Sequence, residues 1–227
     1  MKKLFYILIA IMLVSAVSCD NANTKKDKED STKNDNSSKN IEIKYLEDFM
    51  LFDNHNQMAD YFGDKNVEKT IIYEEEGTLK YNVTIVNPQN TNSVIVYWGI
   101  GNDLEHTKFV KNAHSYYTYD GSDAIDGGEV YPTRVGIELG MNLPEIQKIN
   151  GAAFTFFGLA WDYGGFISEL DAKFNDYTLF IGYANPDFIN NCPDEYYNIL
   201  GDVEFSSENE DALKLGLELV SISYMEK

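Results

Sequence analysis

Four carboxylates recur at every third position in one glycine-rich segment: Asp120, Asp123, Asp126 and Glu129. Hard cations such as Ca²⁺ take about six to eight oxygen ligands, and an acidic loop can provide them. The spacing departs from that of an EF-hand loop, in which acids occupy alternate positions around a central glycine. A solvated acidic loop explains the pattern as well. We therefore expect no bound metal or other cofactor, and these four residues are the candidates if a cation binds.

The common catalytic motifs are missing from the chain. His55, His106 and His114 stand in no H-E-x-x-H arrangement, and neither a Gly-x-Ser-x-Gly elbow nor a phosphate-binding glycine loop occurs. A pair of Asp or Glu side chains for glycan hydrolysis stays open, because carboxylates are numerous. We predict that the protein is not an enzyme, with an envelope glycan hydrolase as one alternative.

Aromatic side chains offer a different chemistry, that of a contact surface. Trp161-Asp162-Tyr163 precedes Gly164-Gly165, a pair that favours a turn with positive φ. Trp and Tyr supply large contact areas with a polar tip, and on alternating strand positions they project to one face. We predict a binding face that bears Trp98, Trp161, Asp162 and Tyr163. The alternative is a structural corner that closes the end of the core.

The charge of the chain restricts its partners. It carries 37 acidic and 18 basic side chains, and residues 41–227 alone hold 32 acidic and 11 basic ones, a formal charge of −21. Such a body is repelled by nucleic acid phosphates and by anionic lipid head groups. Binding of nucleic acid is therefore excluded. A basic or neutral partner is favoured, although solubility alone also explains the charge.

The N-terminal segment has the order of a secretory signal: Lys2 and Lys3, an apolar run from 4 to 14, and small residues before Cys19. Ala16-Val17-Ser18-Cys19 resembles the lipobox of bacterial lipoproteins. That resemblance implies that residues 1–18 are removed as a signal peptide and that Cys19 is lipidated. The protein would then be anchored in a membrane on its extracytoplasmic side. A leader cleaved without lipidation is the alternative.

A polar stretch separates Cys19 from the folded part. Residues 20–40 hold no apolar side chain larger than Ala22, too little to offset the cost of ordering the backbone. We predict a disordered tether over 19–40. Cys192, the only other cysteine in the sequence, is predicted to be a partly buried thiol or to pair with another molecule.

The folded part must position these residues, and its pattern is rich in strands. Apolar and β-branched runs predict strands at 70–73, 80–86, 93–98, 154–157, 166–170, 178–183 and 215–224. Helices are predicted at 54–61 and 143–149, the second with Asn142 as its N-cap and Pro144 in its first turn.

The two helices begin an apparent duplication, in which an apolar residue precedes a glycine at equal spacing. The matched residues are Met58, Phe62 and Gly63 in the first helix and Ile146, Asn150 and Gly151 in the second. Each glycine would be the left-handed residue that ends its helix. Three strands with short connections follow each helix, which favours antiparallel pairing. We predict an α+β fold of two loosely duplicated units, 41–130 and 131–227, each a short helix packed on an antiparallel meander.

The second helix carries a resemblance. The run GIELGMNLPEI from Gly136 to Ile146, followed by Asn150-Gly151, is similar to the opening of BamE-like lipoprotein domains and of the repeats of β-lactamase-inhibitor proteins. In those families a helical element packs on an antiparallel sheet, and the inhibitors bind through a concave, aromatic-rich face. The resemblance implies a fold, and it transfers no contact residues.

Anchor, tether, charge and resemblance together predict a membrane-anchored lipoprotein with a non-catalytic binding or protein-interaction role in the cell envelope. An inhibitor of a secreted enzyme is the second alternative. The predicted partners are the lipid bilayer, through Cys19, and a basic envelope protein or peptide.

Overall fold

The computed structural model describes residues 41–74, 79–99, 108–115, 117, 121–183 and 192–226. The predicted signal peptide, Cys19 and the predicted tether lie outside the described residues. The described residues all belong to one compact unit, which spans 39–227.

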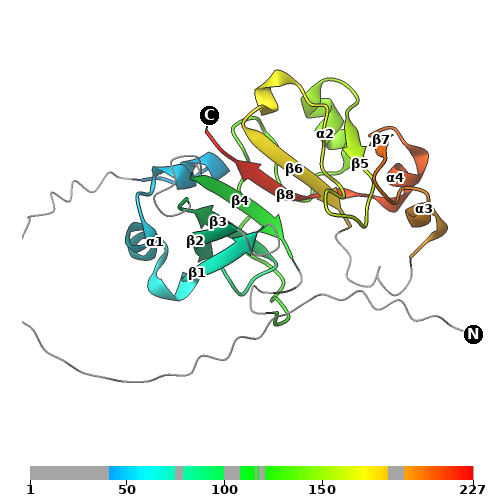
Figure 1. The fold of residues 1–227 in the computed structure, drawn as a ribbon. Helices are drawn as coiled ribbons and strands as arrows, with labels where there is room; N and C mark the ends of the chain where they lie inside the picture. Colours follow the sequence, from blue (N-terminus) through cyan, green and yellow to red (C-terminus); the bar gives the residue numbers. More distant parts are fainter. Residues whose placement is uncertain are drawn as a thin grey trace, which may run out of the picture. The chain divides into compact units, whose positions relative to one another are not determined.

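The described elements combine helices with antiparallel strands, which confirms the predicted α+β class (Figure 1). The helical elements are η1 (Leu46–Leu51), α1 (His55–Phe62), η2 (Asp64–Asn66), α2 (Leu143–Asn150), η4 (Ala172–Phe174), α3 (Asp194–Tyr197) and α4 (Glu210–Leu215). The strands are β1 (Val67–Glu74), β2 (Leu79–Val86), β3 (Asn92–Tyr97), β4 (Phe109–His114), β5 (Thr155–Phe157), β6 (Tyr177–Gly182), β7 (Glu204–Ser206) and β8 (Glu218–Tyr224).

Within the described residues, six strands form one sheet in the order β1-β2-β3-β4-β8-β6. The first half of the chain is an antiparallel meander, as predicted, and β4 extends it by one strand. Strand β8 lies between β4 and β6 (Figure 1), so the two predicted units share a single sheet across residue 130.

The second half also follows its helix with an antiparallel meander, in shortened form. A strand was predicted over 166–170. In the structure this segment forms only two single bridges: Ile167 pairs with Phe156 of β5, and Phe166 pairs with Phe180 of β6. Strand β5 pairs on its other side with β7, which the sequence did not indicate. The predicted strand at 215–224 begins only at Glu218, because Leu215 ends α4.

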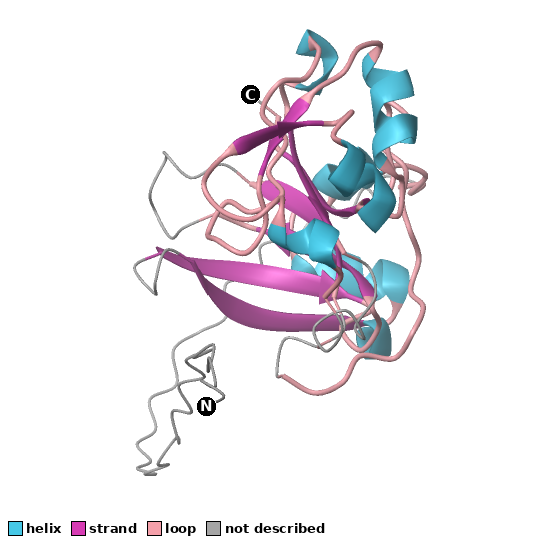
Figure 2. Ribbon diagram, turned by 90° about the vertical axis from the view of Figure 1, so that its right-hand side faces the viewer, coloured by secondary structure: helices cyan, strands magenta, loops and turns pink. Residues whose placement is uncertain are grey.

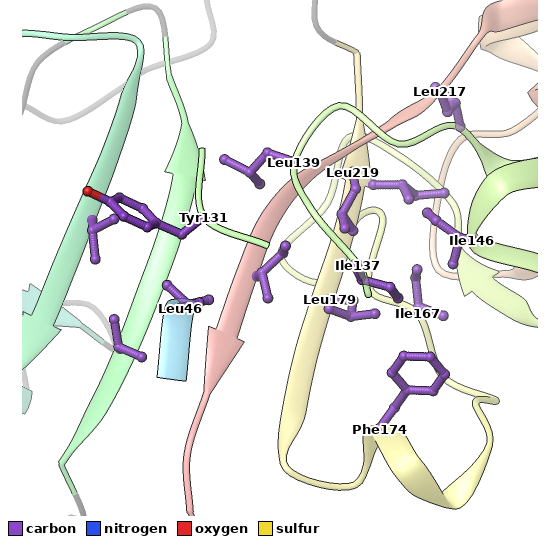
Figure 3. Close-up of a cluster of buried hydrophobic side chains, with 14 of the residues drawn as sticks. Leu46, Tyr131, Ile137, Leu139, Ile146, Ile167, Phe174, Leu179, Leu217 and Leu219 are labelled. Atoms are coloured by element: carbon purple, nitrogen blue, oxygen red, sulfur yellow. The ribbon is translucent and has the colours of Figure 1, made fainter. Parts of the chain in front are cut away.

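One main core fills the space between a single face of the sheet and the helices, which Figure 2 shows gathered on one side of the strands. Figure 3 shows Leu46 of η1 near β4 and β8, and Ile146 of α2 beside Ile167 and Leu219. The opposite face carries a smaller buried cluster of Ile72, Tyr81, Val83, Ile85 and Tyr97. The large sheet is thus apolar on both faces in its first half.

Helix α2 starts as its sequence predicts. Asn142 accepts a hydrogen bond from the backbone N–H of Glu145, and the Glu145 side chain accepts one from the Asn142 N–H in return, which is a capping box. Gly151 ends this helix in the left-handed conformation. Gly63 ends α1 differently, with φ 87° and ψ 139°, so the shared glycine spacing does not produce the same helix ending.

Candidate binding surface

Five aromatic rings form a continuous row along the turn and strands between β5 and β6: Phe157, Trp161, Tyr163, Phe166 and Phe180. Trp161 contacts Tyr163 with 5.4 Å between ring centroids and Phe157 with 5.5 Å. Phe157 stacks on Phe166 at 6.2 Å, and Phe166 contacts Phe180 at 5.6 Å. We call these five side chains the aromatic row.

Strand alternation places three of these rings on one face. Phe156, Ile167, Leu179 and Ile181 point inward and are at most 3% exposed, so their neighbours Phe157, Phe166 and Phe180 point outward. The backbone holds them side by side, because the Phe157 N–H donates to the Phe166 carbonyl and Phe166 is bridged to Phe180.

The remaining two rings come from a turn rather than from a strand. The Gly164 N–H donates to the Trp161 carbonyl at 2.9 Å, and the indole N–H of Trp161 donates to the Gly158 carbonyl at 2.8 Å. Gly165 has φ +81°, and a Cβ there would lie 1.9 Å from the Ile181 carbonyl oxygen. The turn therefore depends on glycine at 165, and it brings Trp161 and Tyr163 together without the strand alternation that was predicted.

None of the five rings belongs to a core. The main core and the half-buried side chains packed against it include none of the row, and neither does the smaller cluster. Tyr163 is 60% exposed, and the other four rings are partly exposed. Trp161 thus does not close the end of the core, which was the alternative for this turn.

Carboxylates border the aromatic row. Asp162 lies between Trp161 and Tyr163 in the turn and is exposed, with no hydrogen bond to any described residue. Glu204 lies opposite Phe157 in the register of β5 with β7 and is also exposed. It accepts a hydrogen bond from Ser168 at 3.0 Å. The rim of the row is therefore negative.

Trp98, the fourth residue of the predicted face, lies elsewhere. It follows Tyr97 of β3, so its indole points to the opposite face of the sheet, where it packs against the main core. Its indole N–H donates to Thr84 at 2.9 Å, and the Lys108 ammonium lies 4.8 Å from its ring centroid. The structure brings Trp161, Asp162 and Tyr163 together and separates Trp98 from them.

Lys108 has a structural role in that region. Its ammonium donates to the carbonyls of Met50 and Phe52 at the end of η1. Burial lowers the pKa of Lys108 below its usual value. Lys108 thus holds the end of η1 beside Trp98.

A buried acid pair that sequence reasoning missed lies on η1. Glu47 and Asp48 are 7% and 5% exposed. Asp48 forms an ion pair with Arg134 and accepts the backbone N–H groups of Lys44 and Tyr45, each at 2.9 Å. Its partner Arg134 lies 86 positions away, so no local pattern could reveal the contact.

Glu47 links η1 to two other parts of the fold. One carboxylate oxygen accepts the backbone N–H of Arg134 at 2.8 Å and the hydroxyl of Tyr177. Burial, with the hydrogen bond to Glu47, raises the pKa of Tyr177 well above its usual value. The second oxygen of Glu47 is buried without a hydrogen-bond partner among the described residues.

The acidic segment at 120–129 does not assemble a metal site in the described part of the chain, where no cluster of three or more His, Cys, Asp or Glu could hold an ion. Asp120 lies outside the described residues. Asp126 accepts a hydrogen bond from Thr91, and Glu129 accepts one from Tyr131 at 2.7 Å. Asp123 lies in an isolated bridge with Tyr117. The carboxylates of Asp126 and Glu129 are therefore engaged in hydrogen bonds within the protein.

Two surface pockets hold one carboxylate each. The first, of about 410 Å³, lies between α2 and α4 and includes Glu208 with Gln147 and Ser207. The second, of about 210 Å³, includes Glu218 with His114 and Asn92. Neither offers the two facing carboxylates that glycoside hydrolysis requires.

The structure describes only one of the two cysteines. Cys192 is half-buried and packs against the main core, which fits the predicted partly buried thiol. Cys19 lies outside the described residues. No helix in the described segments is long and apolar enough to cross a bilayer.

Comparisons with protein-family models, with curated proteins and with solved structures return no match. The resemblance to BamE-like domains and to β-lactamase-inhibitor repeats therefore stays a prediction.

Proposed function

We propose that this protein is an exported lipoprotein, anchored in a membrane through Cys19, with a non-catalytic binding role in the cell envelope. The working surface is the aromatic row with Asp162 and Glu204 at its rim. The predicted lipobox and the polar stretch 20–40 support the anchor and the tether. A body held in this way meets its partners at the membrane surface.

The observation that carries the binding role is the position of the row. Five large rings contact one another, yet none of them packs against either core. Cross-strand aromatic contacts add only modestly to the stability of a sheet, and these rings lack the core burial from which large aromatic side chains gain most of their stabilising effect. Partly exposed aromatic clusters are typical of contact surfaces, where Trp and Tyr contribute most of the binding energy.

The alternative of a glycan hydrolase has less support. Its carboxylates must face one another about 5 to 10 Å apart across a cleft. The two pockets described above hold one carboxylate each. Glu47 and Asp48 are adjacent but buried, and both are occupied by Arg134.

Site-specific photo-crosslinking in living cells tests the proposal. A photoreactive amino acid in place of Tyr163 should form adducts with an envelope component upon irradiation. The same amino acid in place of Tyr73 is the matched control, because Tyr73 is 58% exposed and lies on β1, outside the row. Absence of adducts at position 163, with the protein folded and present at its normal level, would contradict a binding role for the row.

A further inference from the structure

We infer that the aromatic row binds a cationic peptide segment, with lysine or arginine side chains over the rings and the rim carboxylates beside them. The inference rests on the proposed function, since it names the class of partner for the same surface.

The stretch of sequence that carries the row is strongly acidic. Between residues 149 and 213 the sequence holds 12 acidic side chains and a single basic one, Lys173. Lys173 is already occupied, because its ammonium donates to the Ile149 carbonyl and lies 5.2 Å from the ring centroid of Phe174. Lys214, just beyond this stretch, pairs with Asp211 at 3.7 Å. The part of the chain that carries the row still has a large excess of negative charge, which attracts a cationic partner and repels an acidic one.

The rings of the row suit the same partner. A lysine or arginine cation within about 6 Å of a ring centroid gains about 0.5–1 kcal/mol at an exposed site, with Trp the best acceptor. The protein uses this contact internally, with Lys108 over Trp98 at 4.8 Å and Arg134 over Tyr45 at 5.1 Å. Among the described residues, no lysine or arginine lies over a ring of the row. Trp161 and Tyr163 thus leave this contact to a partner.

Asp162 and Glu204 lie where each can pair with a cation bound over the rings. Asp162 separates Trp161 from Tyr163 in sequence, and Glu204 lies opposite Phe157, so each exposed carboxylate adjoins a ring. A cation over such a ring has a counter-ion within reach. A neutral sugar could stack on the rings, but the negative charge of the surface would not attract it.

Fluorescence anisotropy with the full-length protein in detergent tests the inference. The probe is a labelled synthetic peptide of alternating lysine and serine, compared with its glutamate–serine counterpart and with a labelled neutral oligosaccharide of N-acetylglucosamine. We expect the lysine peptide to bind, the glutamate peptide not to bind, and the affinity to fall as NaCl is raised.

Variants locate the contact. Trp161→Ala combined with Tyr163→Ala should lower the affinity for the lysine peptide about tenfold, which corresponds to the loss of two exposed cation–π contacts. Asp162→Asn with Glu204→Gln should flatten the salt dependence. Tyr73→Ala and Glu68→Gln on β1 are the matched controls, since both side chains are exposed and outside the row, and they should leave the affinity unchanged. If the double aromatic variant fails to fold, Tyr163→Ala alone carries the test, because Tyr163 is 60% exposed.

The outcomes separate this inference from the proposed function. Equal binding of the lysine peptide by the wild type and by the aromatic variants, or no binding at all, overturns the cationic partner. Binding of the neutral oligosaccharide that depends on Trp161 overturns it as well but keeps the row as a binding surface. Loss of the crosslinks at position 163 in cells is the separate result that removes the binding role itself.

Discussion

At the scale of single residues, the buried acid pair Glu47 and Asp48 on η1 connects distant parts of the fold. Asp48 accepts two backbone N–H groups and pairs with Arg134, while Glu47 joins η1 to the Arg134 backbone and to Tyr177. These contacts hold the first described segment after the predicted tether onto the second half of the chain.

Asp48→Ala should lower the free energy of unfolding by about 1–3 kcal/mol. The substitution leaves the backbone N–H groups of Lys44 and Tyr45 and the Arg134 guanidinium without their acceptor. Chemical denaturation of the two proteins measures the difference. Asp202→Ala is the control, since it removes the same charge at an exposed position. Equal losses for the two variants would show that net charge, and not the buried contact, matters.

Tyr177 predicts how stability responds to alkali. Its pKa is raised in the folded protein, chiefly by burial and then by the hydrogen bond to Glu47. The unfolded chain therefore loses the tyrosine proton first, at about pH 10. The stability contributed by Tyr177 is fully present below about pH 10 and declines as the pH rises above it. Denaturation between pH 8 and 11 should show this decline in the wild type and a shallower one in Tyr177→Phe; equal slopes would refute the assignment.

At the scale of single residues, the sequence predicted what is local. Trp161, Asp162 and Tyr163 are adjacent, so their association needed only a turn, and Gly164-Gly165 indicated one. Trp98 was placed on the wrong face because strand alternation fixes a side chain only relative to its own strand. Glu47 and Asp48 looked like ordinary surface acids, since their partners come from distant parts of the chain.

At the scale of elements, the turn before Phe166 depends on its close fit to β6. Gly165→Ala places a Cβ 1.9 Å from the Ile181 carbonyl oxygen at a backbone φ of +81°. We expect a loss of about 2–4 kcal/mol in the free energy of unfolding. Gly201→Ala has a similar φ of +92° but nothing within 4 Å, so it should cost only about 1 kcal/mol. If thermal denaturation shows equal losses of stability for the two variants, the close approach of Gly165 to β6 does not contribute to stability.

The row and the core should respond differently to truncation. Phe156→Ala empties a fully buried site of β5 and should cost about 3–5 kcal/mol. Trp161→Ala, in the turn that follows β5, should cost only about 1 kcal/mol, because its ring lies outside the core. Urea denaturation compares them. A loss for Trp161→Ala as large as that for Phe156→Ala would make the row part of the fold and remove the argument for a surface.

Elements with local signals were predicted well, and those without were not. The capping box of α2 lies within four residues, and the strands of the first meander have β-branched runs. Strand β4 (FVKNAH) has no such run, and β7 has only three residues, so both were missed. Their formation depends on pairing with β3 and β5, which only the assembled sheet provides.

At the scale of the whole molecule, composition and pattern predicted an α+β body, and the structure confirms that class. They did not predict that β8 pairs with both β4 and β6 and so joins the two halves in one sheet. A pairing between Ala113 and Ser221 spans most of the folded chain, and no local propensity encodes such a contact. The two predicted units therefore both contribute strands to the six-stranded sheet.

We propose that this acidic, sheet-based body works while tethered to a membrane by lipid on Cys19. Mass spectrometry of the protein extracted from its native membranes tests it most directly. We predict a mature chain that begins at Cys19 and carries diacylglycerol on that thiol, and a Cys19→Ala variant that no longer sediments with membranes. An unmodified Cys19, or a chain that still begins with Met1, would contradict the account.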